Sequence, residues 1–166
     1  MAPARPASIP RMTLPKPELE HVCDLAVTIA APVEIGQTPA GLRRMIPITG
    51  GTLSGPRLNG RVLAGGADFQ LILADGTQAH LDARYAIELH DGSRVFVQNT
   101  ALRVASAEDS RRIMRGEPVD PARIYFRCQP KLEATAPQWA WLNECQFIGT
   151  GRRLPDAVHL SFYRVV

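Results

Sequence analysis

The sequence of 166 residues contains little cysteine and no long apolar run. Cys23, Cys128 and Cys145 are odd in number and widely separated, which argues against a zinc knuckle, a redox pair and a disulfide framework. We therefore expect three reduced thiols. No apolar stretch is long enough to cross a bilayer, and the N-terminus lacks the apolar segment of a signal peptide. These absences predict a cytoplasmic protein without a membrane partner.

Acidic residues are absent from the first 17 residues, which hold Arg5, Arg11 and Lys16. The rest of the chain carries 16 basic and 16 acidic residues, so the pI of about 9.0 reflects this segment rather than a phosphate-binding surface. We do not expect a nucleic-acid partner. Five of the 14 prolines fall in the same segment, which predicts a flexible Pro-rich tail over residues 1–17 and a single domain over residues 18–166.

The common catalytic signatures are also missing. The sequence has no nucleophile elbow, no glycine-rich loop that opens a helix, and four histidines without the spacing of metal ligands. We expect neither a metal nor a cofactor. Any chemistry would then be acid and base catalysis by carboxylate, tyrosine and arginine side chains in a dry pocket, where burial shifts the pKa of a carboxyl group.

The sequence does contain many stretches in which apolar and polar residues alternate, as they do in strands. Two Asp-Gly pairs, at positions 75 and 91, indicate hairpin turns and predict a three-stranded antiparallel meander over residues 67–104. Ser106 and Gly116 indicate the start and end of one short helix. The other expected strands cover residues 22–30, 43–49, 123–129, 139–148 and 157–166.

About eight strands in total, one of them long and curved, predict an all-β fold: an antiparallel β-barrel with one short helix. Closure of that many strands leaves an interior just wide enough for side chains or one small ligand. An incompletely closed barrel would also expose edges through which a second copy of the chain can pair, so a homo-oligomer is compatible with the sequence.

The strand over residues 78–90 carries Tyr85 on its apolar face and Asp82 with Arg84 on the other. Two interpretations of that polar face stay open: an exposed ion pair on the outer surface, or charged groups at a bend that face the lumen. Asp68 and Gln70 point the same way from the preceding strand. Asp68 follows a Gly-Gly pair, which marks either a bulge beside a site or a turn that Asp68 caps.

Two further segments carry polar groups beside aromatic ones. Arg127 shares one face of its strand with Tyr125, which would suit a carboxylate, an enolate or a phenolate, although a simple ion pair with an acid of a neighbouring strand is the favoured explanation of the arginine. Trp139, Trp141 and Asn143 share a face of the expected strand over residues 139–148. Two indoles on one face more often belong to the core than to a binding platform.

The chain resembles the bacterial and fungal family known as domain of unknown function three-two-three-seven, an uncharacterised protein family. The resemblance covers residues 19–166 and is carried by Arg44-Met45-Ile46-Pro47-Ile48 with Gly50-Gly51, Gly55-Pro56 through Gly60 to Leu63, Gly65 to Gln70, Leu81 to Tyr85, Asp91-Gly92, Asn99, Val119-Asp120-Pro121, Tyr125-Phe126-Arg127 and Trp141-Leu142-Asn143. Phe69 stands where we would expect tryptophan.

The resemblance implies a small barrel of the lipocalin or allene-oxide-cyclase type, whose similar members are carriers or cofactor-free cyclases and isomerases. We therefore expect a barrel that binds a small apolar or aromatic oxygenated molecule and acts on it as an isomerase, lyase or cyclase. The alternatives are a carrier and a structural barrel braced by an internal ion pair. The expected catalytic residues are Asp68, Asp82, Arg84 and Tyr85, and the expected ligand-binding residues are Arg44, Gln70, Asn99, Arg127, Trp141 and Asn143.

Overall fold

The computed structural model describes residues 13–166, so most of the predicted tail lies outside the described residues. The strands are β1 (Leu19–Ile29), β2 (Val33–Thr38), β3 (Gly41–Ser54), β4 (Gly60–Val62), β5 (Ala67–Ile72), β6 (Gln78–Leu89), β7 (Arg94–Val104), β8 (Tyr125–Ala134), β9 (Phe147–Arg153) and β10 (Ala157–Val165). The helices are α1 (Ala107–Met114) and two short 3₁₀ segments, η1 (Pro121–Arg123) and η2 (Pro137–Asn143).

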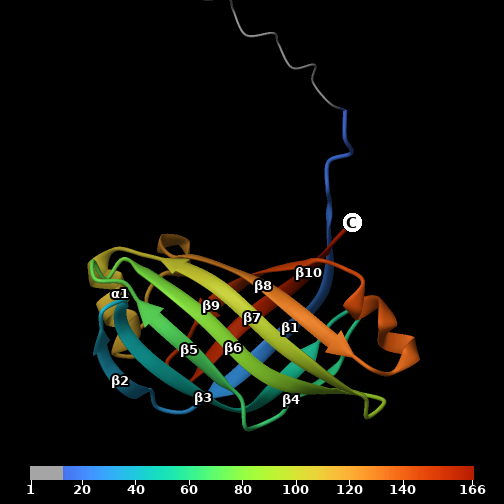
Figure 1. Ribbon diagram of the computed structural model, residues 1–166, viewed down its shortest axis with the longest axis horizontal. Coiled ribbons are helices and arrows are strands. Elements are labelled where there is room, and N and C mark those ends of the chain that lie inside the picture. Colours follow the sequence, from blue (N-terminus) through green and yellow to red (C-terminus); the bar gives the residue numbers. More distant parts are fainter. Residues whose placement is uncertain (1–12) are drawn as a thin grey trace, which may run out of the picture.

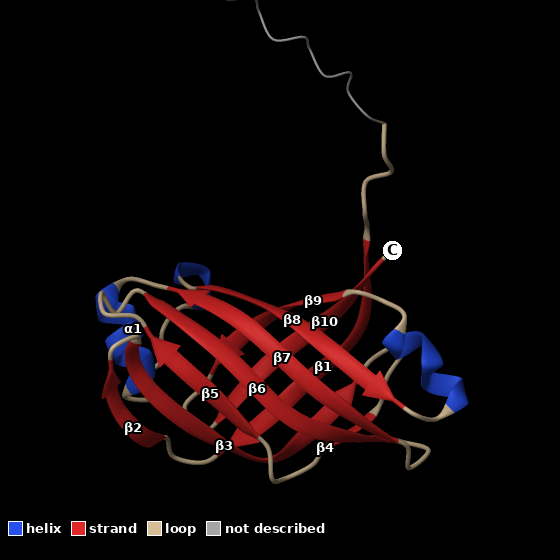
Figure 2. Cartoon of the chain, viewed as in Figure 1, coloured by secondary structure: helices blue, strands red, loops and turns tan. Residues whose placement is uncertain are grey.

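The fold is mostly β, and its strands form a closed antiparallel barrel (Figures 1 and 2). Eight strands close the barrel, and the two shorter strands β2 and β4 extend its wall. Closure depends on β3, which pairs with β2 and β5 over its first half and with β1 and β4 over its second half. Gly50 and Gly51 lie in the second half with φ of 145°, a backbone conformation that glycine adopts without strain. The predicted barrel is confirmed.

The meander predicted over residues 67–104 is present as β5, β6 and β7, with register maintained along β6 and β7. In its two turns Gly76 and Gly92 have a positive φ, whereas Asp75 and Asp91 do not. Asp75 accepts a hydrogen bond from the backbone N–H of Thr77, and Asp91 accepts one from Ser93, both at 2.9 Å. The aspartates therefore stabilise the turns through their side chains while the glycines supply the left-handed backbone.

One predicted strand is wrong. Residues 139–148 were expected to be extended, but residues up to Asn143 form η2, and β9 begins at Phe147. Pro137 begins this 3₁₀ segment, and proline is favoured at the first helical position because its φ is already helical. The spacing of Trp139 and Trp141 resembled strand alternation, although these indoles lie on a tight helical turn.

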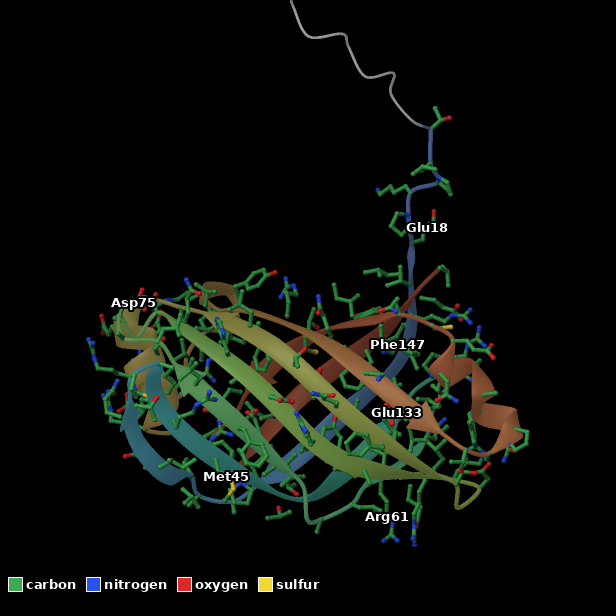
Figure 3. All side chains as sticks on the ribbon, in the orientation of Figure 1. Glu18, Met45, Arg61, Asp75, Glu133 and Phe147 are labelled. Carbon is green, nitrogen blue, oxygen red and sulfur yellow. The ribbon has the colours of Figure 1, made fainter. Side chains whose placement is uncertain are left out.

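The two ends of the barrel are closed differently (Figure 1). α1 covers one end, where Ile113 is buried, and η2 covers the other, where Leu142 is buried among the core residues. Figure 3 shows that side chains fill much of the enclosed space, while Arg61 points from the wall into solvent. Within residues 13–166, no helix has the length and apolar composition needed to cross a membrane.

Candidate functional site

The polar side chains of the lumen gather at the end that α1 covers. Strand alternation places them there: Arg44 points inward from β3, Asp68 and Gln70 from β5, and Asn99 with Arg103 from β7. Tyr85 of β6 and Arg153 of β9 also line this space. The remaining lining is aliphatic or aromatic. The barrel thus encloses a polar cluster within an otherwise apolar interior.

A cavity of about 50 Å³ lies among these residues. Its apolar walls come from β1, β3, β8 and β10 and include Ile46, Phe126 and Leu160. A water needs about 10–15 Å³ of such space, so the cavity has room for a few waters or for a small ligand group.

Asp68 is the carboxyl group of this cavity. Its Oδ2 accepts a hydrogen bond from Gln70 Nε2 at 2.8 Å, whereas its Oδ1 is buried without a partner. Burial raises the pKa of Asp68, an effect that is only partly opposed by the Gln70 hydrogen bond, the charge of Arg103, the backbone of Asp82 and the charge of Arg153. A carboxyl with a raised pKa is able to donate as well as accept a proton. Asp68 does not cap a turn.

Tyr85 and Asn99 add two more unpartnered groups to the same cavity. Tyr85 Oη and Asn99 Oδ1 are both buried without a hydrogen-bond partner. Burial raises the pKa of Tyr85, so its hydroxyl stays protonated and able to donate. Gly66 lets its strand lie close to Tyr85, because a Cβ at position 66 would lie only 2.5 Å from both the Tyr85 Cβ and the Arg84 carbonyl oxygen. The close backbone approach expected of the Gly-Gly pair is present.

Three buried or half-buried arginines, Arg44, Arg103 and Arg153, lie at the end of the site nearest α1. Arg44 and Arg103 are each 4% exposed, and none of the ion pairs in residues 13–166 includes Arg44, Arg103 or Arg153. Burial lowers the pKa of Arg103 to about 10, with further lowering from the charges of Arg153 and Arg44. All three guanidinium groups are still charged at neutral pH.

Asp82 and Arg84 are not part of this site, which corrects their assignment to the lumen. They alternate with Tyr85 along β6 and therefore point outward, where the side chains are 35% and 55% exposed. Arg84 Nη2 lies 3.1 Å from Asp82 Oδ2 in a surface ion pair. The exposed-pair interpretation of this polar face is the one that the structure supports, and no internal ion-pair brace forms from these two residues.

Three other expected ligand-binding residues lie away from the cavity. Arg127 points outward from β8, with its guanidinium 5.0 Å from the ring centre of Tyr125. Trp141 lies on η2 at the opposite end of the barrel, between the guanidinium groups of Arg57 and Arg164. Asn143 is exposed and bonds to the backbone N–H and C=O of Ala134. Their positions give each a local structural role.

Arg103 and Arg153 line the cavity but were not among the expected site residues. Arg103 was accessible to sequence reasoning, since it falls in phase with Val97 and Asn99 on the inner face of β7. Arg153 was not, because β9 had been expected to end at residue 148. Burial raises the pKa of Cys23 to about 12 and of Cys128 to about 11, so neither supplies a thiolate at neutral pH.

A wider hollow of about 760 Å³ lies elsewhere, between β8 and β9. These strands pair only at Arg127 with Thr150 and at Cys128 with Gly149, and they separate beyond that point. The hollow brings together no buried unpartnered polar atoms, unlike the lumen. The smaller lumenal cavity is therefore the candidate site.

Comparison with known proteins identifies several relatives of this barrel. Residues 17–165 match the family described as "Protein of unknown function (DUF3237)". A UPF0311 protein of Rhodopseudomonas palustris is 38% identical over 152 residues, which cover 92% of this chain and 99% of the relative. A crystal structure from that organism has a TM-score of 0.86 and 37% identity, and it covers 92% of this chain and 100% of its own.

A fungal relative is described by an activity. The hydroalkoxylation enzyme phnH of Penicillium herquei is 32% identical over 149 residues, which cover 90% of this chain and 84% of the relative. The crystal structure of an enzyme from Penicillium herquei shares the fold, with a TM-score of 0.69 and 21% identity over 94% of this chain and 100% of its own. The chain described here belongs to the DUF3237 or UPF0311 family of β-barrel proteins.

Proposed function

We propose that the protein is a cofactor-free acid and base enzyme of the isomerase, lyase or cyclase type. Its substrate would be a small apolar or aromatic molecule that carries oxygen. The observation behind this proposal is that Asp68 Oδ1, Tyr85 Oη and Asn99 Oδ1 are all buried, unpartnered and directed to one cavity. Burying polar groups without partners destabilises a fold, so their convergence is typical of a site that a ligand completes.

The three groups have complementary capacities. Asp68, whose pKa is raised by burial, supplies a proton and takes it back. Tyr85 donates a hydrogen bond to a carbonyl or developing oxyanion of the substrate, and Asn99 Oδ1 accepts one from a substrate hydroxyl. The apolar walls exclude water and strengthen these interactions. In this assignment Arg103 and Arg153 are the cations that line the cavity, in place of the outward-facing Arg84 and Arg127.

The fungal relative supports one reaction within this class. Hydroalkoxylation adds an O–H group across a carbon–carbon double bond. Here Asp68 would give its proton to one alkene carbon while the substrate hydroxyl oxygen bonds to the other, and the hydroxyl proton would return to the Asp68 carboxylate. The carboxyl is regenerated, and no cofactor enters the balance. An isomerisation needs only the same proton transfers, from one carbon and to another.

The decisive experiment measures turnover with a panel of phenols, enones and hydroxyalkenes in three proteins: the wild type, Asp68→Asn and Asp82→Asn. Positioned acid and base groups contribute about 100- to 10,000-fold, so kcat should fall by that factor in Asp68→Asn. Asp82→Asn, on the outer wall of the neighbouring strand, is the matched control and should keep full activity. Equal turnover in Asp68→Asn would disprove the role of this carboxyl. Saturable binding without conversion by any of the three proteins would identify a carrier instead.

A further inference from the structure

The α1 end of the lumen holds more positive charge than its own residues neutralise. Arg44, Arg103 and Arg153 line one small hollow beneath Ile113 and Met114 of α1. The positive charges of Arg153 and Arg44 lower the pKa of Arg103, and the charge of Arg44 lowers the pKa of Arg153. The mutual repulsion is a cost that the folded chain carries in its unliganded state.

The acids available to these arginines do not balance them. Asp68 is the carboxyl group that faces all three, and burial raises its pKa, which favours its neutral form. Glu34 acts on Arg44 and Asp156 acts on Arg153, but both acids are exposed, where water and salt screen their charge. Arg103 has no such second acid.

The pairing of other arginines in the described chain makes the contrast clear. Arg57, Arg61 and Arg84 lie on the surface and each contacts a carboxylate within 3.1 Å or less. In water such pairs contribute little, whereas an unpaired charge in the interior is expensive. The three lumenal arginines therefore lack ion-pair partners where pairing would matter most. In addition, Arg44 Nε is buried without a hydrogen-bond partner.

We propose that Arg44, Arg103 and Arg153 form a site for a carboxylate group, and that the substrate or ligand of the barrel is a carboxylic acid anion. This inference rests on the proposed function for the identity of the lumen as a binding site, and it names the class of molecule. A planar carboxylate matches the fork of a guanidinium group and accepts hydrogen bonds from several at once. It is also smaller than a tetrahedral phosphate, in keeping with the narrow spaces that the arginines line, about 10 Å³ beneath α1 and about 50 Å³ in the main cavity.

The proposed carboxylate site lies next to the cavity that holds the acid–base groups. Arg103 and Arg153 line both the hollow under α1 and the main cavity with Asp68. A ligand anchored by its carboxylate at the arginines would extend toward Asp68, Tyr85 and the apolar wall. The anchored anion would also lower the local positive potential that favours ionisation of Asp68, and so help to keep Asp68 protonated for proton donation.

The test uses formate, a carboxylate small enough for the cavity, and follows Tm in formate, chloride and inorganic phosphate at equal ionic strength. A ligand at tenfold its Kd stabilises the native state, and in a domain of this size the expected rise in Tm is about 3 °C. Formate should raise Tm of the wild type more than chloride does. An equal response to chloride overturns the site, and a larger response to phosphate overturns its assignment to carboxylate.

Variants separate this site from a structural role. Arg153→Gln, at the half-buried position, and Arg103→Met should each lose the response to formate, whereas Arg152→Gln, on the outer face of the same strand, should keep it. Arg103→Met should also have a higher Tm than the wild type without ligand, because it removes an unpaired buried charge. A lower Tm with an unchanged formate response would mean that Arg103 is only a structural element.

The same measurements distinguish this inference from the proposed reaction. Asp68→Asn should keep its response to formate, since Asp68 is not one of the three anchoring cations. Cinnamate and its neutral analogue cinnamamide then extend the test to an aromatic acid. We expect saturable binding of cinnamate but not of cinnamamide, and loss of that binding in Arg153→Gln. This result supports the carboxylate site even if no turnover is found. Equal binding of cinnamamide overturns it, even if Asp68 proves essential for a reaction.

Discussion

Asp68→Asn should make the protein more stable at neutral pH while removing its activity. The reason is linkage between protonation and folding. Burial raises the pKa of Asp68 in the folded state above its ordinary value of 3.8, which holds in the unfolded chain. Between these two pKa values the native state binds a proton that the unfolded state has released, so the free energy of unfolding falls as pH rises. Asparagine resembles the protonated carboxyl and has no such dependence.

The sign and size of the effect follow from this difference. Below pH 3.8 both states carry the proton, and the wild type loses nothing relative to Asp68→Asn. Once pH has risen past both pKa values, each unit by which the folded pKa of Asp68 exceeds its unfolded pKa lowers the free energy of unfolding of the wild type by about 1.4 kcal/mol. In a domain of this length, 1 kcal/mol corresponds to about 2–4 °C in Tm. The advantage of Asp68→Asn should therefore be smallest near pH 4 and grow with pH until the pKa of the folded state is reached.

The assay is thermal or urea unfolding of the wild type, Asp68→Asn and Asp82→Asn from pH 4 to pH 8. Asp82→Asn removes a carboxyl from the outer wall and should follow the wild type across this range. The opposite result would refute the reasoning: an Asp68→Asn protein that is less stable than the wild type at pH 7 and equal to it at pH 4. Asp68 would then be ionised and would stabilise the arginines, which is the behaviour of a structural brace.

Four further outcomes are expected. Tyr85→Phe should lower turnover by about 100- to 1000-fold, the effect of removing one oxyanion donor. Its stability in urea unfolding should stay within about 1 kcal/mol of the wild type, because the Tyr85 hydroxyl has no hydrogen-bond partner to lose. Gly66→Ala should cost about 1–3 kcal/mol in the same unfolding assay, since its Cβ would meet backbone atoms. Arg84→Ala should leave Tm unchanged, and a clear loss would restore a bracing role for its surface ion pair. Arg123→Ala should speed amide hydrogen exchange in α1 but not in β6, because the contact of 2.8 Å between Arg123 and the buried Asp109 ties α1 to η1.

The barrel was predictable because its determinants are local. Alternation of apolar and polar residues identifies strands, and the Asp-Gly pairs identify two of the turns that join them. The same alternation separates Tyr85 from Asp82 and Arg84, since neighbours on a strand point to opposite faces. What the sequence could not decide is which face is inside, because that depends on how the sheet closes through the pairing of β1 with β3.

The candidate site was only partly predictable for a related reason. Asp68, Gln70, Tyr85, Asn99 and Arg44 were expected near a ligand, and the structure brings them to one end of the lumen. Their roles stay predictions. Arg127, Trp141 and Asn143 belong to surfaces or to the other end, because β8 faces Arg127 outward and residues 137–143 form a helical turn. A strand boundary displaced by a few residues hid Arg153 altogether.

The unequal ends of the barrel link its stability to its function. The end near η2 is filled with apolar side chains such as Leu58, Leu132 and Leu142, so the same strands can form a fully apolar interior. The α1 end instead collects arginines without ion pairs and polar atoms without partners, each of which lowers stability. Closing the barrel does not require these groups. A ligand that pairs with them would recover the lost stability as binding energy, which makes the least stable end of the lumen the best suited to bind.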